Sequence, residues 1–212
     1  MKRLLRPALS LFLFASFGCD PKPTQVPTST PPTATASGDG RIEDPGVFNS
    51  KRFGMKLRLP RSATWKIDDT TNRWLVATQR AESSTLVVRL WRDENRMNRD
   101  KCEALARSFR PLPSREGAEM LSEQLLDVPP GFDTRAEIGV TTDSKGGIFG
   151  FVLGFGGYGR KCFAYVYVTR AEGPQADAIV ADRLAEMVEG SLTKLTFESD
   201  LEAVLERDVA PP

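Results

Sequence analysis

The sequence predicts an α+β fold in which helices pack on the faces of a central antiparallel sheet. Alternating apolar residues, typical of strands, fill several short runs between residues 47 and 170. Two other segments repeat apolar residues every three or four positions, which is the helical period. The elements follow in the order strands, helix, strands, helix. Because consecutive hairpins make an antiparallel sheet, this order favours helices covering one sheet.

The early strands precede residue 92. Residues 47–60 predict an opening hairpin, because apolar side chains alternate until Pro60 ends the run. A further run lies at 74–77. The run at 86–91 is apolar on both faces, with Leu86, Val88 and Leu90 on one side and Val87 and Trp91 on the other.

A first helix is expected to begin near Asp100, which with Glu103 resembles a capping box. Its apolar stripe contains Cys102, Leu105, Ala106 and Phe109, and Arg110-Pro111 ends it. Residues 115–127 fit both a helical and a strand register. Both assignments stay open at this point, and a strand is expected around 135–141.

Residues 147–170 predict a hairpin in the middle of the sheet, because both arms are apolar on both sides. Their aromatic side chains are expected to form one broad face, which is either core beneath the second helix, the favoured alternative, or a binding surface. Its members are Phe149, Phe151, Phe155, Phe163, Tyr165 and Tyr167. A second helix should follow Gly173-Pro174 and have Gly190 as its C-cap.

The region 47–197 resembles the PsbP-like superfamily of α/β/α sandwich domains. The resemblance lies in the opening Phe53-Gly54 hairpin, the step from Leu59-Pro60 to Trp65, and the order of elements. It implies a non-catalytic envelope or adaptor module that binds another protein. No functional residue is carried over from the superfamily.

The N-terminal region has the pattern of a secretory signal peptide at 1–18. Three basic residues precede a nine-residue apolar run at 9–17, which is too short to span a bilayer. The run ends in Ser16-Phe17-Gly18-Cys19, which resembles the lipobox of bacterial lipoproteins. This resemblance implies acylation of Cys19 and anchoring in a bacterial membrane, inner or outer. Ordinary cleavage that leaves Cys19 as a free thiol is the alternative.

Residues 19–46 are expected to form a disordered linker, since 21–37 hold five Pro and five Thr with no aromatic residue. Extended as polyproline, that segment would reach roughly 50 Å. At the other end, residues 198–212 predict a short helix or tail in which Ser199 and Glu202 form the cap.

Acylation of Cys19 would leave Cys102 and Cys162 as an even pair in an oxidising compartment. We expect a structural disulfide between them, because no Cys-x-x-Cys spacing indicates redox catalysis. Gly154 to Gly159 match a nucleotide-binding pattern by letters but lead into a strand, so a flexible hairpin turn is expected instead. Ser191 and Lys194 match Ser-x-x-Lys by chance, because they follow a helix end.

The amino-acid composition excludes several classes of function. The chain has 212 residues, 29 basic against 28 acidic, and no histidine. A net charge of +1 gives no basis for nucleic-acid binding, and the lack of histidine excludes a histidine-activated nucleophile or an imidazole metal ligand. We therefore expect a periplasm-facing, lipid-anchored interaction module that binds an envelope protein and needs no cofactor. The alternative is a carrier or sensor of an apolar ligand on the aromatic face, and an enzyme ranks third.

Overall fold

The computed structural model describes residues 46–197. The predicted signal peptide, Cys19, nearly all of the linker and the C-terminal helix at 198–212 lie outside the described residues. No helix within 46–197 is long and apolar enough to cross a membrane.

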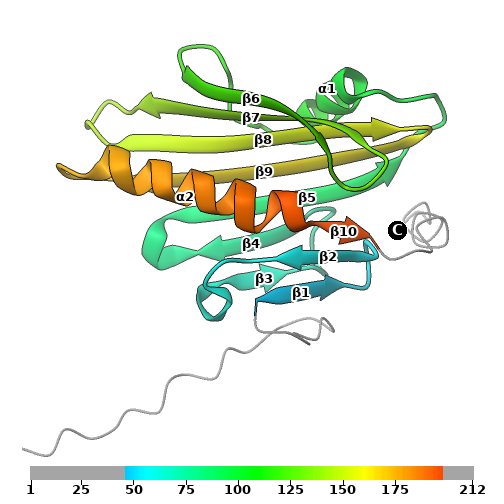
Figure 1. Cartoon of the computed structure of the whole chain (residues 1–212), viewed down its shortest axis with the longest axis horizontal. Coiled ribbons are helices and arrows are strands. Elements are labelled where there is room, and N and C mark those ends of the chain that lie inside the picture. The colour runs from blue at the N-terminus through cyan, green and yellow to red at the C-terminus, as the bar shows by residue number, and fades with distance from the viewer. Residues whose placement is uncertain (1–45, 198–212) are drawn as a thin grey trace, which may run out of the picture. The chain divides into compact units, whose positions relative to one another are not determined.

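The described residues contain a seven-stranded antiparallel sheet, which confirms the predicted α+β class (Figure 1). Its strand order is β3-β4-β5-β9-β8-β7-β6, so one edge is short and the other long. The strands are β3 (Lys66–Asp68), β4 (Leu75–Gln79), β5 (Ser84–Arg92), β6 (Glu119–Asp127), β7 (Asp133–Thr142), β8 (Ile148–Tyr158) and β9 (Lys161–Ala171).

The opening hairpin belongs to a second, small sheet. Strands β1 (Val47–Ser50) and β2 (Met55–Arg58) pair as the alternation of residues 47–60 predicts, and β10 (Thr196–Phe197) adds to β2. Short 3-10 turns lie at Ser62–Thr64, Arg80–Glu82 and Leu192–Lys194.

Two helices cover opposite faces of the large sheet. Helix α1 (Arg99–Phe109) packs on the face that carries Val87 and Trp91, and α2 (Ala176–Gly190) packs on the face that carries Leu86, Val88 and Leu90. The predicted division of β5 into two apolar faces is thus confirmed. The small sheet contributes to the same core as α2.

Both helix boundaries differ slightly from the prediction. The N-cap of α1 is Asn98, whose side chain accepts a hydrogen bond from the Lys101 amide, so Asp100 lies inside the first turn. The expected capping box was wrong because Asn98 has the extended backbone a cap requires. In α2, Gly190 is the last helical residue and Ser191 is the C-cap.

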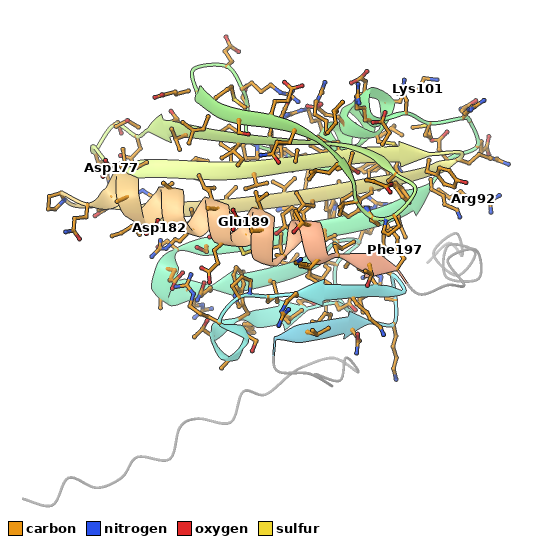
Figure 2. The ribbon with its side chains drawn as sticks, viewed as in Figure 1. Arg92, Lys101, Asp177, Asp182, Glu189 and Phe197 are labelled. Carbon is orange, nitrogen blue, oxygen red and sulfur yellow. A yellow bond between two sulfur atoms is a disulfide. The ribbon has the colours of Figure 1, made fainter. Side chains whose placement is uncertain are left out.

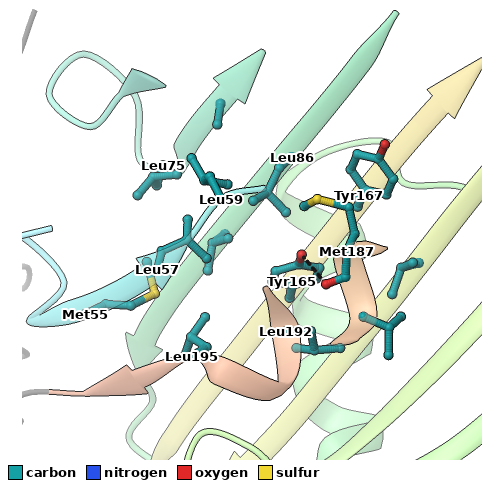
Figure 3. Packing of buried hydrophobic residues seen from close by; sticks show 14 of the residues in the cluster. Met55, Leu57, Leu59, Leu75, Leu86, Tyr165, Tyr167, Met187, Leu192 and Leu195 are labelled. Atoms are coloured by element: carbon teal, nitrogen blue, oxygen red, sulfur yellow. Dashed lines mark hydrogen bonds between the residues drawn. The ribbon is translucent and has the colours of Figure 1, made fainter. Parts of the chain in front are cut away.

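Helix α2 is fixed to the sheet by buried contacts, and Figure 3 shows its Met187 among the residues of the core. Val180, Leu184, Met187 and Val188 enter the core, and the buried hydroxyl of Tyr165 on β9 donates to the carbonyl of Met187 at 3.3 Å. This hydroxyl bond satisfies a polar group that would otherwise be unpaired in an apolar core.

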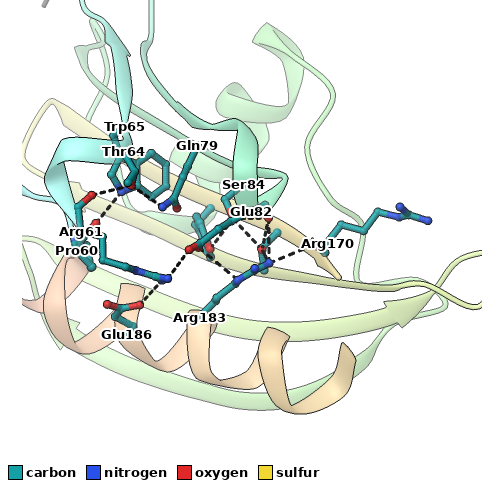
Figure 4. Close-up of polar contacts among 12 residues, drawn as sticks. Pro60, Arg61, Thr64, Trp65, Gln79, Glu82, Ser84, Arg170, Arg183 and Glu186 are labelled. Carbon is teal, nitrogen blue, oxygen red and sulfur yellow. Dashed lines mark hydrogen bonds and ion pairs between the residues drawn. The ribbon is translucent and has the colours of Figure 1, made fainter. Parts of the chain in front are cut away.

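Polar contacts hold α2 towards the β4–β5 side of its face (Figure 4). Arg183 donates to the carbonyl of Glu82 at 2.9 Å and pairs with the Glu82 carboxylate, and Arg61 bridges Glu82 and Glu186. Because α2 packs against β8 and β9 and is held on that side, strands β7 and β6 are less covered.

Candidate interaction surface

The six aromatic residues proposed as one face lie on both sides of the sheet. Phe151 and Phe155 pack in the core beside α1, with Phe149 at its margin. Phe163, Tyr165 and Tyr167 belong to the core beneath α2. The five residues other than Phe149 are essentially inaccessible to solvent. The prediction of one broad aromatic surface was therefore wrong.

The register of the β8–β9 hairpin explains this result. A two-residue turn, Gly159-Arg160, pairs Gly154 with Tyr165 and Phe155 with Ala164. Directly paired residues share a face, so the aromatics of one arm lie beside the small residues of the other. Large and small side chains thus alternate across each face and fill both cores.

Cys102 and Cys162 form a disulfide that joins α1 to β9. Their Cα atoms lie 5.4 Å apart, and both side chains are completely buried. Cys102 lies on the apolar stripe that the sequence indicates, and both residues belong to the core beside α1.

The glycine-rich segment is a strand rather than a flexible turn. Strand β8 continues to Tyr158, so Gly154, Gly156 and Gly157 lie inside it. A Cβ atom at Gly156 would collide with the side chain of Thr134, and one at Gly157 would collide with the backbone of Asn98. These glycines therefore permit the close approach of β7 and of the start of α1.

The Ser-x-x-Lys letters follow the end of a helix, as the sequence indicates. Ser191 is the C-cap of α2 and is completely buried. Among residues 46–197, no group of three or more acidic or cysteine side chains is placed to hold a metal ion.

The most exposed regular element is β6, the long edge of the large sheet. It pairs only with β7 among the described strands and has a bulge between Met120 and Ser122. Met120, Leu121 and Leu125 are 40%, 48% and 64% exposed. They are half of the exposed large hydrophobic residues within 46–197, the others being Phe109, Tyr158 and Ile179. Such a concentration on one edge is unusual for a monomer surface.

An open hollow of about 680 Å³ lies between this edge and the first turns of α2. Leu121, Val140 and Ile148 form its apolar wall, while Glu119 and Asp177 are the acidic residues on its lining. Asp177 lies at the first turn of α2 (Figure 2). A second, more open hollow of about 390 Å³ adjoins the other end of β6, lined by Leu125, Leu126 and Phe132.

An ion cluster on the α1 face supports strand β7, the neighbour of β6. Glu103 of α1 accepts hydrogen bonds from Arg107, Arg115 and Arg135 at 2.6–2.9 Å. Arg115 and Arg135 also contact Glu137 of β7. The cluster therefore joins α1, the segment after it and β7. Burial disfavours ionisation of Glu103, but hydrogen bonds from Arg115 and Arg107 outweigh it and lower the Glu103 pKa to about 2.

This lowered pKa predicts an acid-sensitive stability. The folded state holds Glu103 ionised while the unfolded chain protonates it near pH 4.5, so its contribution is complete above pH 4.5 and is lost as pH falls towards 2. Glu103→Gln should flatten the fall in the urea unfolding midpoint between pH 5 and 2. Glu94→Gln, at an exposed carboxylate outside the cluster, should leave that slope unchanged. Equal slopes for wild type and Glu103→Gln would contradict the prediction.

Sequence reasoning missed the β6 surface because residues 115–127 fit two registers. A usable signal was present, since the nine residues of β6 contain three acids, no base and four large apolar side chains. A core strand rarely carries that many charges.

Comparison with known proteins assigns no family. No family model matches the sequence, and no curated protein matches it. Among solved structures, the chain is similar to a protein of Bacteroides thetaiotaomicron, with a TM-score of 0.42 and 10% identity over 73% of this chain and 49% of the other. The chain thus spans about half the length of that protein.

A second similar structure is LpqN of Mycobacterium tuberculosis, described as involved in cell envelope biogenesis. Its TM-score is 0.39, with 15% identity over 67% of this chain and 82% of LpqN. Both TM-scores lie below 0.5, so neither likeness assigns a function to this chain.

Proposed function

We propose that this chain is a lipid-anchored protein of the bacterial cell envelope that acts as a non-catalytic protein–protein interaction module of PsbP-like type. The observation that carries the proposal is the exposed edge strand β6, whose outer side pairs with no other strand within residues 46–197 and which carries three solvent-exposed apolar residues. A strand edge of this kind is a template for binding an extended segment of another protein.

The location outside the cytosol is supported by two features. The lipobox-like sequence ending at Cys19 follows a signal-peptide pattern. The disulfide between Cys102 and Cys162 is of the kind that persists in oxidising compartments and is rare in the cytosol.

We expect Cys19→Ser to release the protein from the membrane fraction of the bacterium that makes it. Acyl chains are the proposed anchor, and without the Cys19 thiol they cannot be attached. The test is fractionation combined with intact mass spectrometry of the mature protein. A wild-type protein that is uncleaved and carries no acyl mass would refute the anchoring, and Ser16→Ala is the control that retains Cys19.

Binding of an apolar ligand is the second candidate, supported by the hollow beside α2. The hollow is large enough for a small lipid and has three aliphatic side chains on its wall. Its place differs from the aromatic face first considered. Native mass spectrometry of the purified protein decides this alternative, since a lipid carrier should retain a bound lipid.

A further inference from the structure

Strand β6 is a long edge whose pairing with β7 is regular from Ser122 to Asp127, so another strand can add to it there. Its nine residues form one edge of the sheet, whereas the opposite edge, β3, has only three. Alternate residues of β6 project to the two faces, as the pairing with β7 defines. The α1 face carries Met120, Glu123, Leu125 and Asp127, and the α2 face carries Glu119, Leu121, Ser122, Gln124 and Leu126.

The charge of β6 is one-sided. Glu119, Glu123 and Asp127 are its charged residues, and all three are exposed. Within residues 46–197, no basic side chain pairs with Glu119 or Glu123. On the α1 face, Arg115 and Arg135 form their ion pairs with Glu103 and Glu137 instead. The edge therefore presents negative charge that the domain does not neutralise.

Because of this negative charge, a second copy of this chain is poorly suited to pair with β6. Antiparallel pairing of two β6 strands centred on Glu123 places Glu123 opposite Glu123. In any other register, the two β6 strands together still contain six acidic residues and no basic residue. Like charges opposite each other destabilise strand pairing.

We propose that β6 binds an extended segment of another protein by strand addition, and that this segment carries Lys or Arg residues on the face beside α1 and apolar residues on the face beside α2. This inference rests on the proposed interaction function and names its site and the chemistry of its partner. Main-chain hydrogen bonds along the edge supply binding that depends little on sequence, and the side chains supply specificity.

The two faces of β6 favour different side chains on the partner segment. On the α1 face, a Lys or Arg opposite Glu123 places its positive charge near Glu123 and Asp127. Its methylene stem would cover Met120 and Leu125, which are solvent-exposed in the domain alone. The hollow beside Leu121 offers an aliphatic wall on the α2 face, and the hollow at the other end of β6 offers Leu125 and Leu126. A partner segment in which basic and apolar residues alternate would therefore be complementary to both faces of β6.

The test uses the purified full chain and two nine-residue peptides, one alternating Lys with Val and one alternating Glu with Val. We expect the Lys-Val peptide to bind, to slow hydrogen exchange of the β6 amides and to bind more weakly as salt increases. The Glu-Val peptide should do none of these. Protection confined to another element, or equal binding of both peptides, would overturn the proposal.

Charge reversal supplies the matched variants. The double variant Glu123→Lys/Asp127→Lys should bind the Lys-Val peptide about tenfold more weakly and should prefer the Glu-Val peptide. Glu94→Lys/Asp93→Lys, the same charge change in the loop after β5, should keep the wild-type preference. Leu125→Ser should weaken binding while leaving the unfolding midpoint unchanged, because this side chain is 64% exposed.

Self-association is measured on the same samples. A mass that doubles with concentration in light scattering, together with β6 protection in the absence of peptide, would identify a second copy as the occupant and overturn the proposal. We expect a monomer mass for the acyl-free chain at the concentrations used.

Photo-crosslinking in membranes separates this inference from the proposed function. A photoreactive residue replaces Leu125 in one protein and the exposed Lys101 of α1 in another. We expect a crosslinked protein from position 125, with less of it in the presence of the Lys-Val peptide. A partner captured only from position 101 would overturn the β6 site but leave the interaction function standing, whereas capture from neither would count against the interaction function itself.

Discussion

Replacing Cys102 and Cys162 together by alanine is expected to lower the free energy of unfolding by about 4 kcal/mol. The bond closes a loop with a sequence separation of 60 residues, and opening it restores that loop's conformational freedom to the unfolded chain. For a domain of this size the loss corresponds to a fall of roughly 10 °C in Tm. Urea and thermal unfolding of wild type and variant measure it.

The loss should come chiefly from the unfolded state, so the unfolding m-value should increase as the chain expands further. Wild type reduced with a thiol reagent under denaturing conditions is the matched control and should lose similar stability. A Cys19→Ser background keeps a third thiol from exchanging with the pair. A variant less than about 1 kcal/mol below wild type would show that the cross-link is energetically unimportant here.

Gly157→Ala is expected to destabilise the fold by about 3 kcal/mol. A Cβ atom at this position would lie 2.6 Å and 2.7 Å from the carbonyl carbon and Cα of Asn98, the residue that caps α1. Backbone cannot rotate away as a flexible side chain can, so α1 must shift from the sheet while the disulfide still holds it. The measurement is the urea unfolding midpoint.

The same strand contains the control for this substitution. A Cβ atom at Gly154 would meet only Tyr165 and Leu192, at 3.4–3.7 Å, which is ordinary van der Waals contact. Gly154→Ala should therefore be neutral or stabilise by up to about 1 kcal/mol, because alanine loses less backbone entropy than glycine in a strand. If the two variants were equally destabilised, the steric explanation would fail.

The parts of the fold that depend on local periodicity were predictable. The alternation in 86–91 assigned both faces of β5 correctly, and the stripe through Cys102 and Ala106 placed α1 on the sheet. Both inferences need only the geometry of one element. The pairing of Cys102 with Cys162 followed because each lies on the buried side of its own element.

Other features depend on how elements meet. The aromatics of β8 and β9 fell on opposite faces because the length of the turn at Gly159 sets the register, and a shift of one residue exchanges the faces. The β6 surface depends on strand order, since the three acids within residues 119–127 argue against a core strand but do not place the strand at an edge. The acidic residues of β6 are evident in the sequence, but only the strand order shows that they lie on an exposed edge of the sheet.

The inequality of the two sheet edges has a consequence for stoichiometry. β3 is too short to template a long neighbour, so the sheet can be extended on one side only. A segment bound at β6 would become the new edge strand of the sheet. This domain would then have no second long edge strand to which a third chain could bind. Complexes formed in this way should therefore end at one partner per domain and should not grow into filaments.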